Sequence, residues 1–184
     1  METKGKWSIK TVEITGDKTQ LEHEHPVQGA GFEGSPPGTY EILYNNDKKS
    51  VIMSDNLMET EDQEEFLGLA EGHIVIGGLG LGLIALRLLK KSGIKSITII
   101  EIDQDVIDLV SPRLVSYPEV SVLLGDVRNF NYNTLKFPPD YVYMDIWDGT
   151  STGSFQDRIS VLNYWSQCCK RCFAWALERS ERKK

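Results

Sequence analysis

Three alternating glycines and one carboxylate are the residues of this chain best suited to chemistry. Gly78, Gly80 and Gly82 come directly after the apolar run 73–77, where a buried strand must turn sharply into a helix. Without Cβ atoms, such a turn lets a ligand lie against the backbone at the positive N-terminal end of that helix. Glu101 ends the next apolar run, roughly 20 residues further on, where the acid of a nucleotide-type site binds ribose hydroxyls. The pattern predicts such a site.

Further acids follow the next two apolar runs of the chain. Asp126 comes after the third run, and Asp145 and Asp148 come after the fourth. An Asp carboxylate accepts a hydrogen bond from an exocyclic amine readily. The pair Asp145 and Asp148 is suited to act as a general base or as a counter-charge for an amine, and a structural role for the pair is equally compatible with the sequence. Asp103 suits a helix N-cap as well as a ligand contact.

The elements that must position these residues alternate between strands and helices. We expect strand 73–77, helix 81–92, strand 96–101, helix 104–115, strand 119–124 and strand 140–145. Short apolar strands alternating with helices are typical of an α/β fold with a Rossmann-like parallel sheet covered on both faces. Right-handed crossovers place the C-terminal ends of all strands at one edge, where such sheets bind ligands. The glycine turn and the acids should therefore meet there.

The first part of the chain has a different pattern. Residues 7–14 alternate between apolar and polar, and residues 39–44 and 50–53 flank an Asn/Asp-rich turn, which predicts a strand followed by a β-hairpin. An acidic amphipathic helix is expected over 57–70, and a helix begins near 155. Arg171–Leu177 fits either a final strand or more helix. The chain divides into N-terminal strands, loop and β-hairpin (1–56) and a Rossmann-like cofactor-binding domain (57–184).

The glycine turn and the acids that follow successive strands resemble those of the class I S-adenosylmethionine-dependent methyltransferases. The resemblance implies S-adenosylmethionine as the cofactor, with its methionine part at Gly78, Gly80 and Gly82. It also implies that Glu101 binds the ribose hydroxyls and that Asp126 lies beside the adenine amine.

Within that superfamily, the chain is most similar to the spermidine-synthase-like branch. The similar segments are Val75–Gly82, Ile100–Asp103 and Asp140–Asp145. In that branch an Asp after the fourth strand binds and deprotonates the attacking amine. The resemblance therefore implies Asp145 and Asp148 as catalytic residues, and decarboxylated S-adenosylmethionine as an alternative cofactor for aminopropyl transfer. A narrower resemblance to short, uncharacterised methyltransferase-like proteins of phages and bacteria covers most of the chain and brings no assigned substrate.

The sequence departs from that branch in two respects, and these departures leave alternative functions open. Asp148 is followed by Gly149–Ser154 without a proline, and the chain ends soon after the fifth helical region, so we expect a truncated class I methyltransferase fold. A transferase acting on a small molecule is favoured. The alternative is a cofactor-binding protein without transferase activity, or an enzyme that degrades S-adenosylmethionine. A nicotinamide dinucleotide is the second choice of ligand, but its Gly-x-Gly-x-x-Gly fingerprint would need a glycine at Leu83.

The bulk properties narrow the choice of partners. A net charge of −7 leaves no broad basic surface, so we expect neither nucleic acid nor a membrane as partner. A small-molecule substrate is expected instead, with an amine as one candidate. The sequence has neither a secretory signal nor an apolar run long enough to span a membrane, which favours a cytoplasmic protein. An exposed last strand in a truncated sheet would favour a homodimer.

Three cysteines cluster late in the chain, at Cys168, Cys169 and Cys172. Neither a second Cys pair nor a nearby His accompanies them in the sequence, as a structural zinc site would require. The cluster therefore favours reduced thiols that pack around a helix over a metal site or a redox pair. We expect no metal in this protein.

Overall fold

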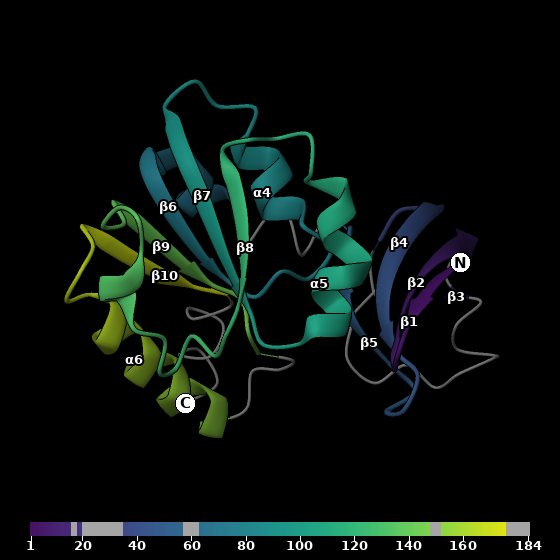
Figure 1. The fold of residues 1–184 in the computed structure, drawn as a ribbon. Helices are drawn as coiled ribbons and strands as arrows, with labels where there is room; N and C mark the ends of the chain where they lie inside the picture. The colour runs from purple at the N-terminus through teal and green to yellow at the C-terminus, as the bar shows by residue number, and fades with distance from the viewer. Residues whose placement is uncertain (16–17, 20–34, 57–62, 148–151, 176–184) are drawn as a thin grey trace.

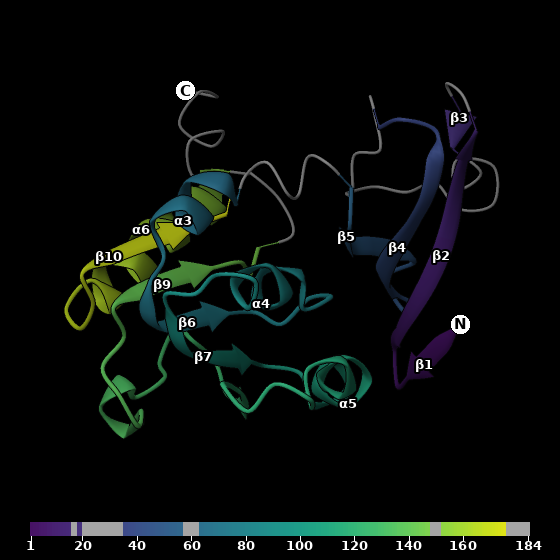
Figure 2. The same cartoon turned by 90° about the horizontal axis from the view of Figure 1, so that it is seen from above.

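The computed structural model describes residues 1–15, 18–19, 35–56, 63–147 and 152–175. The strands are β1 (Glu2–Lys4), β2 (Trp7–Thr15), β3 (Lys18–Thr19), β4 (Gly38–Asn45), β5 (Ser50–Ser54), β6 (Gly72–Gly77), β7 (Ile94–Glu101), β8 (Val120–Leu124), β9 (Tyr141–Met144) and β10 (Arg171–Ala174). The α-helices are α3 (Glu64–Leu69), α4 (Leu83–Leu88), α5 (Gln104–Val110) and α6 (Thr152–Trp165). The strands form two sheets, and α5 lies between them (Figures 1 and 2).

The larger part of the described chain is built on a parallel sheet with the strand order β10-β9-β6-β7-β8. Every neighbouring pair in this sheet is parallel. The first strand in sequence, β6, lies in the middle, and the chain moves outward from it first on one side and then on the other. This is the doubly wound, Rossmann-like order, in which ligands bind where the strand order reverses. In this sheet that point lies between β6 and β9. The parallel, doubly wound sheet confirms the predicted α/β, Rossmann-like fold class.

The period-2 alternation of strand side chains divides the parallel core between two faces. Ile74 and Ile76 of β6 are buried with residues of α3, α4 and α5. Val75, between them in sequence, is buried on the other face with Val161 and Trp165 of α6. Strands buried on both faces must be apolar along their whole length, which explains the nearly continuous apolar runs of the sequence.

The N-terminal sheet is antiparallel and has the order β1-β2-β4-β5, with β3 paired to β2. The predicted β-hairpin is present as β4 and β5, and the side chain of Asn45 accepts hydrogen bonds from the backbone N–H groups of Asp47 and Lys48 within its turn. Ile9, Leu43 and Met53 of this sheet belong to the same buried cluster as β6 and β7. The two sheets therefore share one hydrophobic core.

Polar contacts reinforce that shared core. Arg113, just after α5, donates two hydrogen bonds to the carboxylate of Glu41 on β4, at 2.8 and 3.1 Å. Lys4 of β1 forms an ion pair with Asp108 of α5 at 3.0 Å. Because these groups are partly exposed, each ion pair contributes little free energy, and the apolar packing remains the main attachment of the N-terminal sheet.

The structure sharpens several predicted boundaries. The helix predicted over 81–92 begins only at Leu83, because Gly82 has a positive φ of 78° at its N-cap, and it ends at Leu88. The helix predicted over 104–115 ends at Val110 and continues as a 3-10 turn over Ser111–Arg113. The ambiguous segment after α6 is a strand over Arg171–Ala174. In the part of the chain that the structure describes, no helix has the length and apolar character needed to cross a membrane.

Candidate functional site

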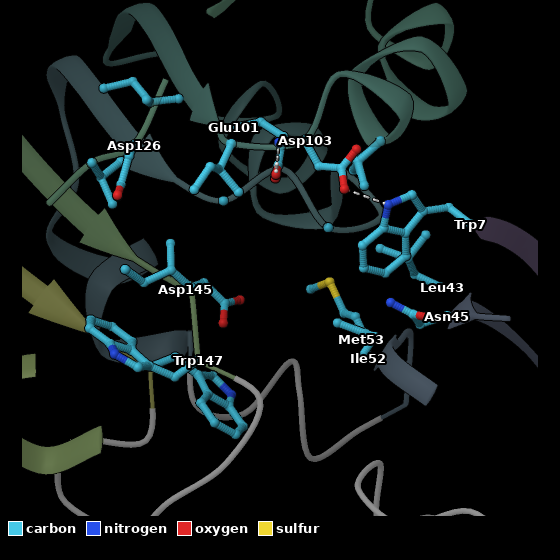
Figure 3. A pocket seen from close by; sticks show the side chains of 18 of the residues that line it. Trp7, Leu43, Asn45, Ile52, Met53, Glu101, Asp103, Asp126, Asp145 and Trp147 are labelled. Carbon is cyan, nitrogen blue, oxygen red and sulfur yellow. Dashed lines mark hydrogen bonds between the residues drawn. The ribbon is translucent and has the colours of Figure 1, made fainter. Parts of the chain in front are cut away.

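A cavity of about 400 Å³ opens at the carboxyl edge of the parallel sheet. One side of it is formed by the turns after β6, β7, β8 and β9, and the other side by β2, β4 and β5 of the N-terminal sheet (Figure 3). A volume of this size is typical of small-molecule and cofactor sites. Of the predicted site residues, the cavity is lined by Gly78, Gly80, Glu101, Asp126 and Asp145. The parallel topology therefore brings together residues spread over almost 70 positions.

The glycines of the turn after β6 are required by its backbone. Gly78 has a φ of 91°, and a Cβ there would overlap the backbone carbonyl oxygen of Asp145. Gly80 has a φ of 52°, and a Cβ there would overlap the sulfur of Met53. Gly82 is the N-cap of α4 and does not line this cavity. The turn thus brings bare backbone to the cavity wall at Gly78 and Gly80.

Glu101 ends β7, and its carboxylate is fixed by the backbone. One oxygen accepts a hydrogen bond from the N–H of Leu79 in the glycine turn at 2.8 Å, and the other accepts one from the N–H of Asp103 at 2.9 Å. The residue is only 8% exposed and lies on the cavity wall. An ionised carboxylate has about four acceptor sites, so two remain for a ligand. A buried acid with both oxygens oriented in this way is a pre-organised receptor for hydroxyl groups.

Asp103 has the capping role that the sequence allowed. It is the N-cap of α5, and its side chain accepts a hydrogen bond from the N–H of Asp105 at 3.0 Å. Its other oxygen accepts a hydrogen bond from the indole N–H of Trp7 at 2.8 Å and lies 3.0 Å from the ammonium of Lys6. Partial burial acts to raise the pKa of this carboxyl, but the hydrogen bonds from Trp7 and Lys6 outweigh burial and lower the pKa.

Asp126 lies after β8 and is partly engaged within its own turn. Its carboxylate accepts a hydrogen bond from the N–H of Arg128 at 3.0 Å, and the guanidinium of Arg128 lies 3.6 Å away. The same cavity is also lined by the apolar residues Ile102 and Val127, which are neighbours in sequence of Glu101 and Asp126. Ile102 is 63% exposed, which is unusual for an isoleucine directly after a buried strand. An apolar, exposed side chain at this place suits the face of a flat aromatic ligand.

The turn after β9 carries Asp145 and Trp147. The indole N–H of Trp147 donates to the carboxylate of Asp157 at 2.7 Å, and the guanidinium of Arg128 donates to the same carboxylate at 2.9 Å. The hydrogen bond from Arg128 is the largest influence on Asp157 and lowers the pKa of its carboxyl. These contacts restrain the Trp147 ring at the cavity wall.

Arg158 of α6 lies beneath this ring and is completely buried. Its guanidinium is 4.7 Å from the centre of the Trp147 ring and 5.7 Å from that of Trp175, and its Nε donates to the carbonyl of Trp175 at 3.0 Å. Burial lowers the pKa of Arg158, while the charges of Asp145 and Asp157 act in the opposite direction. Asp145 therefore stands beside a buried positive charge. Asp148, the other predicted catalytic acid, lies outside the described residues.

The wall contributed by the N-terminal sheet was not part of the predicted site. Trp7, Asn45 and Met53 line the cavity from that side (Figure 3), and the sulfur of Met53 accepts a hydrogen bond from the N–H of Leu81 at 3.3 Å. The contact from Trp7 to Asp103 spans 96 positions of the chain. An aromatic residue at the start of a half-exposed strand was the only signal for this wall, and that signal does not specify which surface the side chain reaches.

The chain is similar to solved structures, but the comparisons assign it to no protein family. No protein-family model matches the chain, and no curated protein matches its sequence. Solved structures that match include a candidate RNA methyltransferase from Pyrococcus horikoshii, with 20% identity and a TM-score of 0.49 over 64% of this chain. A second is an S-adenosylmethionine-dependent methyltransferase from Clostridium acetobutylicum, with 17% identity and a TM-score of 0.44 over 60% of this chain. The match spans about half the length of those proteins, 55% and 43% respectively.

Proposed function

We propose that this protein binds S-adenosylmethionine at the carboxyl edge of its parallel sheet and transfers a group from it to a small molecule. The observation that carries the proposal is the carboxylate of Glu101, buried beside the glycine turn and oriented by the N–H groups of Leu79 and Asp103. Two unused acceptor sites on one rigid carboxylate match the two vicinal hydroxyls of a ribose. That match favours a nucleoside-type ligand over a simple amine or acid.

The rest of the cavity can accommodate the remaining parts of that cofactor. Ile102, Val127 and Asp126 line the cavity, and we assign the first two to the faces of the adenine ring and Asp126 to its exocyclic amine. The methionine part would lie over the bare backbone of Gly78 and Gly80. In the nicotinamide alternative, a third glycine is expected where Leu83 stands, and Leu83 is the first residue of α4. The methyl-donor cofactor is therefore the better fit.

The acceptor is proposed to be a small molecule, with an amine as the first candidate class. The turn after β9 presents Asp145 and Trp147 to the cavity, opposite Met53 and Trp7. An enzyme of this kind mainly needs to align donor and acceptor and to exclude water. Asp145 lines the cavity, and we assign its carboxylate the role of receiving a proton or balancing a cation, with Asp148 proposed for the same role. The acidic net charge of −7 is unfavourable for a polyanionic acceptor.

Titration calorimetry tests the choice of cofactor. The protein is titrated with S-adenosylmethionine, decarboxylated S-adenosylmethionine and NAD under the same conditions. We expect saturable binding of one of the first two and none of NAD. Binding of NAD alone would overturn the proposal, and so would the failure of all three ligands to bind a protein that unfolds cooperatively.

An Asp145→Asn variant separates transfer from mere binding. The change removes a charge while keeping the size of the side chain, so we expect cofactor affinity to change by less than about threefold, which is under 1 kcal/mol. Group transfer to an amine acceptor should fall by about 100-fold or more if this residue removes a proton. Incubating the wild type with cofactor alone, followed by product identification, distinguishes transfer from degradation of the cofactor and from binding without chemistry.

A further inference from the structure

Two of the three cysteines lie in contact at the beginning of β10. Cys169 is in the turn that follows α6, and Cys172 is the second residue of β10. Their sulfur atoms are 3.0 Å apart, and both residues are only partly buried. A disulfide bond needs about 2.05 Å between sulfurs. To bond, the two sulfur atoms would have to approach by about 1 Å, in a turn that already brings the two side chains together.

The neighbourhood of this pair is pre-organised on both sides. The backbone N–H of Lys170 donates to the carbonyl of Asp140 at 2.9 Å, and the Lys170 ammonium forms an ion pair with the carboxylate of the same residue at 2.9 Å. The Arg171 guanidinium forms an ion pair with Glu65 of α3 at 2.7 Å. The two residues between the cysteines are thus anchored to other elements, which reduces the entropy lost on closing the small ring.

The three thiols differ in their ease of ionisation. A hydrogen bond from Cys172 is the largest influence on Cys169 and, with one from the backbone N–H of Arg171, lowers its pKa despite burial. The same contact with Cys169, together with burial, raises the pKa of Cys172. Burial raises the pKa of Cys168 to about 11. The thiols of Cys168 and Cys169 both lie within hydrogen-bond distance of the Trp165 carbonyl, at 3.2 and 3.3 Å, so this contact does not distinguish them. Because the thiolate is the nucleophile in disulfide exchange, Cys169 is the group that reacts first.

We propose that Cys169 and Cys172 form a redox site that reduces a low-molecular-weight disulfide and closes to an intramolecular disulfide. The Cys169 thiolate attacks one sulfur of the small disulfide, which expels one small thiolate and leaves a mixed disulfide on Cys169. Cys172 then loses its proton and attacks the Cys169 sulfur, which releases the second small thiolate. Two protein thiols are oxidised and one small disulfide is reduced to two thiols, the departing thiolates taking up the two protons.

This site is separate from the cofactor cavity. The strand β10 runs from the cysteine pair to Trp175, which lines the cavity at the opposite end of the strand. Because neither cysteine lines the cavity, we expect ring closure at Cys169 and Cys172 to leave the residues around Glu101 in place. The inference therefore does not rest on the proposed function, and oxidised protein should bind S-adenosylmethionine with unchanged affinity.

The test is to incubate the whole reduced protein with oxidised glutathione and then to count free thiols and measure the intact mass. We expect two of the three thiols to disappear, with a mass decrease of two hydrogen atoms and no retained glutathione. Peptide mapping should join Cys169 to Cys172, and dithiothreitol should restore all three thiols. Cys168→Ser is the matched control, and it should form the same intramolecular bond.

Two variants sharpen the test further. Cys172→Ser should stop at the mixed disulfide and retain one glutathione. Cys169→Ser should react at least about tenfold more slowly than the wild type, because it lacks the thiol that ionises most readily. The proposal would be overturned if the wild type kept all three thiols, if it retained glutathione without closing the ring, or if the mapped bond contained Cys168. The wild-type measurement decides this even where a variant fails to fold.

Discussion

The two ends of the cavity are built in different ways. At the end proposed for the cofactor, the decisive contacts run from backbone to side chain within one β-α-β unit: the N–H groups of Leu79 and Asp103 orient Glu101. At the other end, side chains from distant parts of the chain orient one another, as Trp147, Arg128 and Asp157 do. The first kind of site is determined by local backbone geometry. The second kind of site depends on how separate elements pack against one another. Its side chains can be replaced without altering the fold.

This difference predicts that changes in the glycine turn have the largest effects. Gly78→Ala places a Cβ against the carbonyl oxygen of Asp145 at a φ of 91°, so we expect a loss of about 3 kcal/mol or more of unfolding free energy and no measurable cofactor binding. Urea unfolding and calorimetry measure the two effects. Gly68→Ala is the matched control, because nothing lies within 4 Å of its Cβ position on α3, and it should be neutral or slightly stabilising. Equal effects of the two substitutions would contradict the comparison.

The next largest effect is expected at Glu101. Glu101→Gln keeps the shape and one acceptor oxygen but removes the charge, which should weaken cofactor binding by about 10- to 100-fold. Glu119→Gln, which changes an exposed acid just before β8, serves as the control and should bind as the wild type does. Unchanged affinity of Glu101→Gln, with its fold intact by circular dichroism, would mean that the ribose lies elsewhere.

Changes in the wall from the N-terminal sheet should have smaller effects. Trp7→Phe keeps an aromatic ring, though a smaller one, and removes the hydrogen bond to Asp103. We expect a loss of about 1–2 kcal/mol of unfolding free energy, with cofactor affinity lowered less than threefold. Tyr40→Phe, on β4 of the same sheet, is the control. It removes an exposed hydrogen bond to the carbonyl of Pro36 and should lower the unfolding free energy by less than about 0.5 kcal/mol. Thermal unfolding and calorimetry on both variants measure the contrast. A Trp7→Phe protein that no longer binds the cofactor would contradict the division between the two ends.

The smallest effect is a pH dependence that originates at Asp103. The folded protein lowers the pKa of this carboxyl, because the hydrogen bonds from Trp7 and Lys6 outweigh burial. Its contribution to stability is therefore present above the unfolded pKa of about 3.9 and is lost as pH falls through the lower folded value. Asp103→Asn retains a helix-capping side chain. Its deficit in unfolding free energy relative to the wild type should be constant above about pH 5 and shrink below about pH 4. A deficit that grows on acidification would contradict this assignment.

The same difference explains how much of the molecule could be predicted from the sequence. The parallel sheet, the glycine turn and Glu101 follow from apolar runs, glycines and an acid at regular spacing, and the sheet is parallel as predicted. The side chains of Trp7 and Met53 could not be placed at the cavity, and that of Asp157 could not be placed beside Trp147. Their positions depend on the packing of the N-terminal sheet and α6 against the parallel sheet. Two residues can each carry a clear local pattern and still give no indication that they meet across 96 positions of the chain.

Ile102 and Arg158 illustrate two other limits of sequence reasoning. Ile102 is an apolar residue between two acids, and only the structure shows that its side chain is exposed at the cavity. Arg158 lies in a helix of mixed composition, where an arginine normally faces solvent. It is instead completely buried beneath Trp147. Both residues depart from the usual burial of their type, and each does so at the candidate site.

A crystal structure of the protein with S-adenosylhomocysteine tests the central claim most directly. We expect both ribose hydroxyls on the carboxylate of Glu101, the adenine ring between Ile102 and Val127 with its amine toward Asp126, and the amino-acid part over Gly78 and Gly80. A ligand bound elsewhere, or a cavity that stays empty at saturating ligand while Glu101 keeps its contacts with Leu79 and Asp103, would contradict it.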